Sequence, residues 1–197
     1  MFTGIIQALG HIKTKVSYDK GAVFSFSATN FDFSSVAIGD SIAVNGVCLT
    51  AVEIGEDFFK ADVSQETLDC SIFSQLEQGD SVNLEKALRL NQGIDGHLVS
   101  GHVDGIAQVN DQFKEGESTR FKISVPDNLV KYIAKKGSVC INGVSLTVNS
   151  ITDNIFDLNI VPHTLTVTTL GKLKVGSKVN LEVDIIARHL EQLLKSK

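Results

Sequence analysis

The stretch VNGVCLTAV, residues 44–52, returns almost unchanged as INGVSLTVN, residues 141–149. The spacing of 97 residues between these copies also relates FTG at 2–4 to VSG at 99–101, and VNLE at 82–85 to VNLE at 179–182. Because the spacing is constant, no net insertion separates the two halves. It is far longer than the roughly 20–50 residues of solenoid repeats. The sequence therefore predicts a duplicated domain.

Both halves consist of short segments in which apolar and polar residues alternate, with turn residues every few positions. This pattern predicts antiparallel β-structure, as a barrel or a sandwich. Asn45-Gly46 and Asn142-Gly143 each lie between two such segments and predict tight hairpins, because both turn positions favour positive φ. The predicted strands are 22–28, 41–44, 48–54 and 58–63, and in the second half 120–125, 138–141, 145–151 and 155–161.

Helix is expected in two places only. Pro126–Gly137 begins with proline and ends with glycine, which is typical of a short capped helix. The tail from Asp184 places Ile185, Leu190, Leu193 and Leu194 near helical spacing and predicts an amphipathic helix. Its apolar side could dock on another subunit or pack on its own domain, and the sequence favours neither.

Composition excludes several functional classes. The 197 residues carry a formal net charge of -5, which disfavours nucleic-acid binding. No apolar run approaches the roughly 18 residues that a membrane span needs, and the first residues do not resemble a signal peptide. Cys48, Cys70 and Cys140 lack CxxC spacing, which disfavours both a disulfide framework and a zinc site. A cytoplasmic protein is expected.

The repeated phrase carries a polar pair on one face of a strand. Cys48 and Thr50 alternate with Val47, Leu49 and Ala51, and in the second copy the pair is Ser145 and Thr147. Solvent exposure would explain one such pair. Its return in both halves, with a thiol exchanged for a hydroxyl, favours two related binding sites that have diverged.

The glycine-rich segment GIDGHLVSGHVDG, residues 93–105, carries the histidines His97 and His102. Their spacing in such a flexible segment is poor for chelation, so no metal site is predicted. These residues alone do not name a ligand.

Several phrases in this order resemble the riboflavin synthase family, of the trimeric type. They are MFTGII at 1–6, the two copies of the NGV phrase, GHLVSGHVDG at 96–105, VPHT at 161–164 and TTLG at 168–171. The resemblance implies an all-β fold of two homologous six-stranded antiparallel Greek-key β-barrels plus a C-terminal α-helix. The implied units are residues 1–97, 98–184 and a trimerisation helix over 185–197.

The resemblance also implies a reaction. Two molecules of 6,7-dimethyl-8-ribityllumazine give riboflavin and 5-amino-6-(D-ribitylamino)uracil by transfer of a four-carbon unit, with no cofactor and no metal. A duplicated fold suits two copies of one substrate with different fates. The active site would form between the first barrel of one subunit and the second barrel of another, in a homotrimer. Association with a lumazine synthase shell is left open.

Site residues follow from the same resemblance. Catalytic roles are implied for Cys48, His102, Ser145, Asp184 and Ser41, with Phe2 also at the substrate. A first-barrel substrate set comprises Gly4, Ile5, Ile6, Cys48, Leu49, Thr50, Asp62, Val63, Ser64, Gln65, Glu66 and Thr67. A second-barrel set comprises Gly101, His102, Val103, Lys136, Ser145, Leu146, Thr147, Asn159, Ile160, Val161, Pro162, His163 and Thr164. His102 is the expected proton-transfer group near neutral pH.

The alternative is a lumazine protein, a non-catalytic antenna with the same double barrel, which binds lumazine or flavin unchanged. Retention of Cys48, His102 and Ser145 favours the enzyme. The first half carries SIFSQL at 71–76 where relatives have a TNLG-like turn, and the tail is short, so local contacts there and trimer strength depart from the family pattern.

Overall fold

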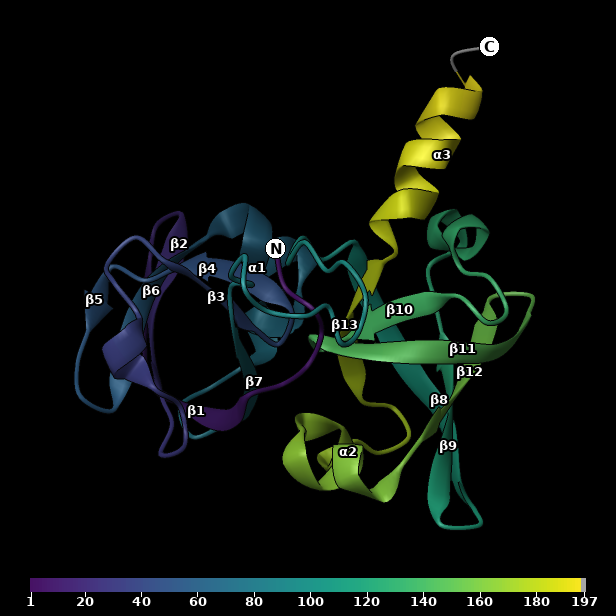
Figure 1. Ribbon diagram of the computed structural model, residues 1–197, viewed down its shortest axis with the longest axis horizontal. Helices are drawn as coiled ribbons and strands as arrows, with labels where there is room; N and C mark the ends of the chain where they lie inside the picture. Colours follow the sequence, from purple (N-terminus) through teal and green to yellow (C-terminus); the bar gives the residue numbers. More distant parts are fainter. Residues whose placement is uncertain (196–197) are drawn as a thin grey trace.

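The computed structural model describes residues 1–195, and most of their regular structure is antiparallel β-strand in two bodies that lie side by side (Figure 1). The first-half strands are β1 (Ala8–Tyr18), β2 (Gly21–Ser27), β3 (Ser41–Val44), β4 (Val47–Thr50), β5 (Glu53–Ile54), β6 (Phe58–Ser64) and β7 (Ser81–Lys86). The second-half strands are β8 (Gly105–Glu115), β9 (Ser118–Ser124), β10 (Ser138–Ile141), β11 (Val144–Thr152), β12 (Ile155–Ile160) and β13 (Lys178–Val183). The predicted all-β class is confirmed.

The second half forms a closed barrel in the order β10-β11-β12-β9-β8-β13, a Greek-key arrangement. The first half has the same order, written β4-β3-β7-β1-β2-β6-β5. The single strand β11 of the second half corresponds to two strands of the first half, β4 and β5. These two are separated by Ala51 and Val52, which are not in a strand. The Val52 amide still donates to the Lys60 carbonyl of β6 at 2.9 Å. The strand predicted over 48–54 is therefore two pieces.

Both predicted hairpin turns are confirmed, since Asn45, Gly46, Asn142 and Gly143 have φ of 45°, 79°, 46° and 82°. The tips of these hairpins meet where the two barrels join. A Cβ on Gly46 would lie 2.7 Å from the Gly143 nitrogen, so only glycine allows this contact.

The asparagine of each VNLE phrase fastens the two barrels together. The Asn83 side chain donates to the Asn142 carbonyl at 2.7 Å, and the Asn180 side chain donates to the Asn45 carbonyl at 2.8 Å. Both asparagines are buried, where an unpaired amide would cost about 1–3 kcal/mol. The repeat thus specifies the joint between the barrels as well as each barrel.

Each barrel has its own core. Six phenylalanines dominate the first core, whereas the second is mainly aliphatic; the six are Phe24, Phe26, Phe31, Phe33, Phe59 and Phe73. As predicted, Val47, Leu49 and Ala51 face the first core, while Cys48 is half-buried and Thr50 is exposed. The polar pair therefore lies on the outer face of its strand.

The helix expected over Pro126–Gly137 is wrong in type and length, because the structure has a 3-10 helix, η3, over Asp127–Tyr132. The Leu129 amide donates to the Pro126 carbonyl and the Ile133 amide to the Val130 carbonyl, which is the i→i+3 pattern. The other short elements are η1 (Phe33–Ser35), α1 (Gln65–Cys70), η2 (Ile72–Gln75), α2 (Pro162–Val167) and η4 (Thr169–Lys172).

The predicted tail helix is confirmed as α3 (Ile185–Lys195); its last two predicted positions, 196–197, lie outside the described residues. It projects away from both barrels (Figure 1). Arg188 pairs with Asp104, and Glu191 pairs with Lys131. Its apolar residues Ile186, Leu190, Leu193 and Leu194 are 55–70% exposed, so they do not pack on their own domain. None of the described helices has the length and apolarity to cross a membrane.

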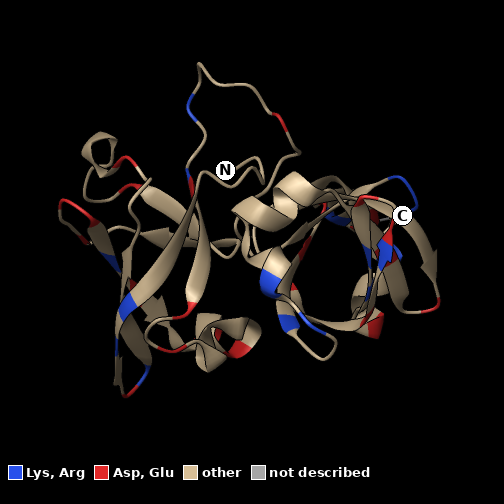
Figure 2. Cartoon of the chain, turned by 90° about the horizontal axis from the view of Figure 1, so that it is seen from below, with Lys and Arg blue, Asp and Glu red and all other residues tan. Residues whose placement is uncertain are grey.

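Acidic and basic positions are interspersed around both barrels (Figure 2), consistent with the small net charge of -5.

Candidate functional site

Two buried glutamates, one in each VNLE phrase, hold the chain segments that reach the candidate sites. Glu85 accepts hydrogen bonds from the Thr3 amide and hydroxyl, both at 2.7 Å, and from the Gly4 amide at 3.0 Å. Glu182 binds Ser100 and Gly101 in the same way. Burial raises the pKa of Glu85, and the donors from Thr3 and Gly4 act against that rise.

Each held segment then bonds to the opposite barrel. The Ser145 amide of β11 donates to the Gly4 carbonyl, and the Cys48 amide of β4 donates to the Gly101 carbonyl, both at 2.8 Å. Ile6 packs against the core of the second barrel, and Val103 packs against the core of the first. The two barrels thus exchange their site segments.

This exchange makes the predicted grouping of substrate residues wrong. Gly4 to Ile6 belong with the second barrel, and Gly101 to Val103 belong with the first. A constant repeat spacing shows which positions are equivalent, but it does not show which barrel a connecting segment reaches.

Both segments need glycine at the point of contact. Gly4 and Gly101 have φ of 77° and 81°. A Cβ on Gly4 would lie 2.6 Å from the Ser145 Cβ, and a Cβ on Gly101 would lie 2.6 Å from the Cys48 Cβ. Backbone conformation and space therefore both exclude a side chain there.

The first-barrel site is a pocket with a volume of ≈ 240 Å³. Its lining includes Cys48, Glu66, Thr67, Cys70, Gly101 and His102. Among these, Cys48, Glu66, Thr67, Gly101 and His102 were predicted, and the structure brings them together. Cys70, at the end of α1, was missed, because this helix was not expected.

The second-barrel site centres on Ser145 and His97. The Ser145 Oγ lies 2.7 Å from His97 Nδ1, and the His97 amide donates to the Thr3 carbonyl at 3.1 Å. Burial lowers the pKa of His97, while the charge of Asp184 acts to raise it. The Nε2 atom of His97 is buried and has no partner among residues 1–195. A neutral imidazole that shares a hydrogen bond with a hydroxyl is suited to proton transfer through that hydroxyl.

Sequence reasoning missed His97 as a site residue, although it noted both histidines of the glycine-rich segment. His97 and Ser145 are 48 residues apart, and no pattern in the sequence links them.

Asp184 connects this site to the tail helix. Its Oδ1 accepts a hydrogen bond from the Ile186 amide at 2.9 Å at the start of α3, and its charge acts on His97. A carboxylate there also complements the helix dipole.

His97 predicts a pH dependence of stability. Its folded-state pKa lies below the ordinary value of 6.5, so the unfolded chain binds more protons as the pH falls below about 6.5. The free energy of unfolding should therefore decrease with falling pH in this range, and His97→Gln should reduce that slope. Urea unfolding between about pH 5 and 7.5 measures the slope for both proteins. Equal slopes would contradict the burial of a neutral His97.

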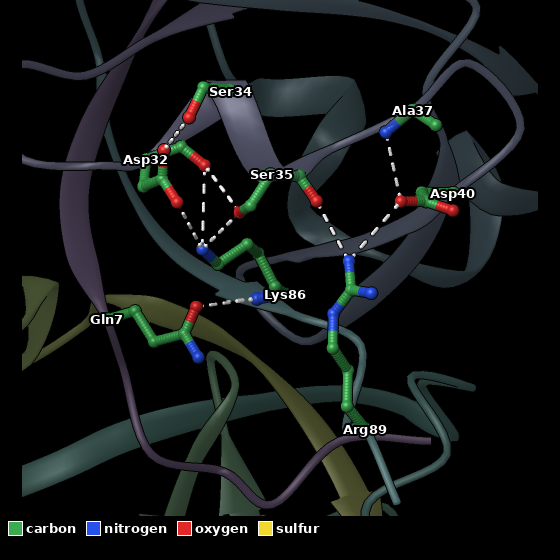
Figure 3. Close-up of polar contacts among 8 residues, drawn as sticks. All are labelled: Gln7, Asp32, Ser34, Ser35, Ala37, Asp40, Lys86 and Arg89. Carbon is green, nitrogen blue, oxygen red and sulfur yellow. Dashed lines mark hydrogen bonds and ion pairs between the residues drawn. The ribbon is translucent and has the colours of Figure 1, made fainter. Parts of the chain in front are cut away.

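Ser41 lies at a different place from Cys48. It lines a separate hollow of ≈ 210 Å³ together with Asp40, Lys86 and Arg89. Figure 3 shows how the two cations beside it are held: Lys86 donates to the Ser35 hydroxyl at 2.9 Å, and Arg89 donates to the Ser35 carbonyl at 2.8 Å.

The same cluster contains two carboxylates. Hydrogen bonds from the Ser34 and Ser35 hydroxyls, with the charge of Lys86, lower the pKa of Asp32 to about 2. Asp40 pairs with Arg89 and accepts from the Ala37 amide (Figure 3). The charged side chains beside Ser41 are thus paired with one another, Lys86 with Asp32 and Arg89 with Asp40.

Other predicted residues fall into two groups. Phe2, Leu49, Val63 and Ile160 are at most 4% exposed, so only their backbone could reach a ligand. Phe2 pairs with Val99 and packs with Ala43, Cys140 and Cys48 beneath the first-barrel site. Exposed or half-buried positions are Ile5, Thr50, Asp62, Ser64, Gln65, Leu146, Thr147, Asn159, Val161, Pro162, His163 and Thr164.

Lys136 has a left-handed backbone with φ of 66°, whereas its counterpart in the first half is Gly39, with φ of 95°. A non-glycine residue in this region costs roughly 1–2 kcal/mol. Lys136→Gly should therefore raise the free energy of unfolding by up to about 1 kcal/mol, after the extra flexibility of glycine in the unfolded chain. Lys135 does not have a positive φ, so Lys135→Gly should lower the free energy of unfolding instead. Chemical denaturation of both variants tests this strain.

Within residues 1–195, no group of three or more His, Cys, Asp or Glu side chains is arranged to hold a metal ion.

Comparison with known proteins agrees with this geometry. The model of the lumazine binding domain matches residues 3–87 and 100–184, the same spacing of 97 residues as the repeat. The chain is 47% identical to the riboflavin synthase of Photobacterium phosphoreum, over 98% of this chain and 89% of that protein. It is 34% identical to the riboflavin synthase of Bacillus subtilis, over 98% and 90%.

Solved structures give the same result for the fold. LumP complexed with 6,7-dimethyl-8-(1'-D-ribityl)lumazine matches with a TM-score of 0.84 and 30% identity, over 93% of this chain and 99% of that chain. LumP complexed with riboflavin matches with a TM-score of 0.85 and 32% identity, over the same shares. The duplicated lumazine binding domain and the identity to curated enzymes over nearly the whole chain show that it belongs to the riboflavin synthase family.

Proposed function

We propose that the protein converts two molecules of 6,7-dimethyl-8-ribityllumazine into riboflavin and 5-amino-6-(D-ribitylamino)uracil, as a transferase that needs no cofactor. The observation that carries this proposal is the pair of equivalent but chemically different sites. One combines Cys48 with His102, and the other combines Ser145 with His97. Two identical substrates with different fates require two such similar, unequal sites.

In this reaction the protein has two tasks: it holds the two substrate rings in position, and it transfers a proton. The electron-poor ring system of the lumazine makes its C7 methyl group acidic, so a weak base is sufficient to remove a proton. Neutral His97 can accept a proton at Nδ1 through the Ser145 hydroxyl, whose Oγ lies 2.7 Å away. A positioned base of this kind contributes about 10²- to 10⁴-fold. Holding two rings in reacting register contributes up to about 7–11 kcal/mol.

The catalytic assembly we propose is a homotrimer in which the first-barrel site of one subunit faces the second-barrel site of another. None of the second-barrel residues Gly4, His97 and Ser145 lines the first-barrel pocket among the described residues. An 11-residue helix is marginally stable alone, and the apolar side of α3 is exposed. Contact with α3 of sister subunits would cover it.

Three further points belong to the same proposal. The protein is cytoplasmic, and its units are residues 1–97, 98–184 and 185–197. Docking with a lumazine synthase is compatible with this assembly.

The second candidate is a binding protein without turnover. The similarity to LumP, which was solved with lumazine, riboflavin and flavin mononucleotide, favours it. A thiol or a hydroxyl lies with a histidine at each site, which favours the enzyme, because binding alone requires neither.

Incubation with 6,7-dimethyl-8-ribityllumazine, with no metal or nucleotide added, tests the proposal. One riboflavin formed for every two lumazines consumed is the expected result. Lumazine bound tightly and recovered unchanged would instead establish the binding protein. Cys48→Ser and Ser145→Ala should each lower turnover while leaving a lumazine bound at the unaltered site, which fluorescence titration counts.

A further inference from the structure

The segment α1–η2 of the first barrel and the segment α2–η4 of the second have the same local structure. In the first, the Ser71 hydroxyl donates to the Thr67 carbonyl at 2.5 Å. In the second, the Thr168 hydroxyl donates to the Thr164 carbonyl at 2.6 Å. The two segments also have the same order of exposed, half-buried and buried positions. A residue of α2 therefore occupies the place in its barrel that the residue 97 positions earlier occupies on α1.

The two helices differ in charge. Glu66 and Asp69 of α1 are acidic, whereas the equivalent residues of α2 are His163 and Thr166. All four side chains are exposed, so a ligand can reach them. Glu66 lines the first-barrel pocket together with Cys48. The second-barrel site thus has a histidine at the place where the first-barrel site has a carboxylate.

A further cation lies beside the second-barrel site only. The Lys136 amide donates at 2.8 Å to the carbonyl of Val148, the residue after Thr147 on β11. The Lys136 side chain is exposed, and within residues 1–195 its ammonium has no hydrogen bond or ion pair. Its counterpart in the first barrel is Gly39. The acid of the second-barrel site, Asp184, acts on His97 and binds the start of α3.

We propose that the second-barrel site accepts a ribityl ligand whose chain ends in an anionic group, such as a phosphate ester, and that the first-barrel site binds it more weakly. This inference rests on the proposed function, which puts one ring at Cys48 and one at Ser145. The ribityl chain of each ligand then extends along the remaining polar wall, which α1 or α2 forms. Glu66 can accept hydrogen bonds from ribityl hydroxyls, but it repels a phosphate, whereas His163 can donate to either group.

Riboflavin and flavin mononucleotide test the proposal, because they differ only in the terminal phosphate. Fluorescence titration at about pH 6, where histidine side chains are largely charged, counts the ligands bound per chain. Protection from alkylation reports on the first-barrel site alone, since Cys48 and Cys70 line it and the equivalent residues of the second barrel are Ser145 and Val167. Riboflavin should fill both sites and protect the thiols. Flavin mononucleotide should fill the second-barrel site first and should protect the thiols only at an at least about threefold higher concentration than riboflavin.

Exchange of the two side chains tests their role. Glu66→His should lower the ratio of the two protecting concentrations, and His163→Glu should weaken flavin mononucleotide relative to riboflavin at the second-barrel site, each by at least about threefold. Glu56→His makes the same charge change on an exposed residue between β5 and β6, outside the pocket, and should leave the ratio unaltered.

Two results would overturn the inference and leave the proposed function intact: equal affinity of both flavins for the first-barrel site, or an unaltered ratio in both Glu66→His and His163→Glu. Failure of riboflavin to bind at either site would overturn the inference and the proposed function together.

Discussion

Substitution of Leu190 and Leu193 by aspartate is expected to convert the protein to single chains and to lower riboflavin formation at least about 100-fold. These leucines are 55% and 67% exposed and lie on one side of α3, which points away from both barrels (Figure 1). In the proposed homotrimer, charge there would prevent the α3 helices of the three subunits from packing together. If each active site forms between subunits, separated chains cannot hold two substrates face to face.

The control is Gln192→Asp, which introduces one negative charge, where the double variant introduces two, on a different side of the same helix. It should keep both the assembly and the turnover. Light scattering gives the mass of the assembly, and initial rates over a range of protein concentrations give the turnover. A double variant that remains trimeric would contradict the role of α3. Monomers with full activity would show instead that one chain contains a complete active site.

The attachment of α3 to its own barrel is polar. Hydrogen bonds from Lys131, Lys195 and Tyr132 lower the pKa of Glu191 to about 2. Arg188 pairs with Asp104 and donates to the His102 carbonyl at 3.3 Å. The base of the helix therefore contacts the segment that lines the first-barrel site.

Much of the fold could be predicted because the repeat and the local patterns agree. Asn45-Gly46 and Asn142-Gly143 specify hairpins locally, and the alternation around Cys48 specifies which side chains face the core. The short helices α1 and α2 were missed, since six residues are too few to show helical periodicity. The interruption of the strand after Thr50 was missed because its pattern continues through Val52.

The candidate site was predictable only in part, because it depends on contacts between residues that are far apart in the sequence. Cys48, Ser145 and His102 stand in recognisable phrases, whereas the pairing of His97 with Ser145 depends on how a connecting segment crosses between barrels. Glu85 and Glu182 direct that crossing, and in the sequence they are ordinary acidic residues at strand ends. Long-range hydrogen bonds to the backbone leave no local pattern.

A glycine-to-alanine substitution at each crossing should disable one site at a time. In Gly101→Ala the new Cβ would lie 2.6 Å from the Cys48 Cβ and 2.9 Å from the Phe2 ring, so the segment must move away from Cys48. In Gly4→Ala the same conflict arises with the Ser145 Cβ and nitrogen, at 2.6 and 2.7 Å. Displacement of a site segment by about 1 Å is sufficient to lower turnover about 100-fold.

The two variants differ in the site that they spare. Gly101→Ala should retain a lumazine at the Ser145 site, and Gly4→Ala should retain one at the Cys48 site. Fluorescence titration should therefore count half the bound lumazine of the unaltered protein in each variant. In Gly101→Ala, the change in the environment of Cys48 should alter its rate of alkylation, whereas Gly4→Ala should leave that rate near its original value.

Gly79→Ala is the control that distinguishes backbone strain from a steric clash of the new Cβ. Gly79 has φ of 93°, and nothing lies within 4 Å of the position that a Cβ would take. This variant should lose roughly 1–2 kcal/mol of stability from its left-handed backbone alone, and it should keep both lumazines and full turnover. If Gly4→Ala and Gly101→Ala behaved like Gly79→Ala, the crossing segments would not form the sites. If either removed both lumazines from a folded protein, the two sites would be one cooperative unit, because Phe2 and Val99 pair between the crossing segments.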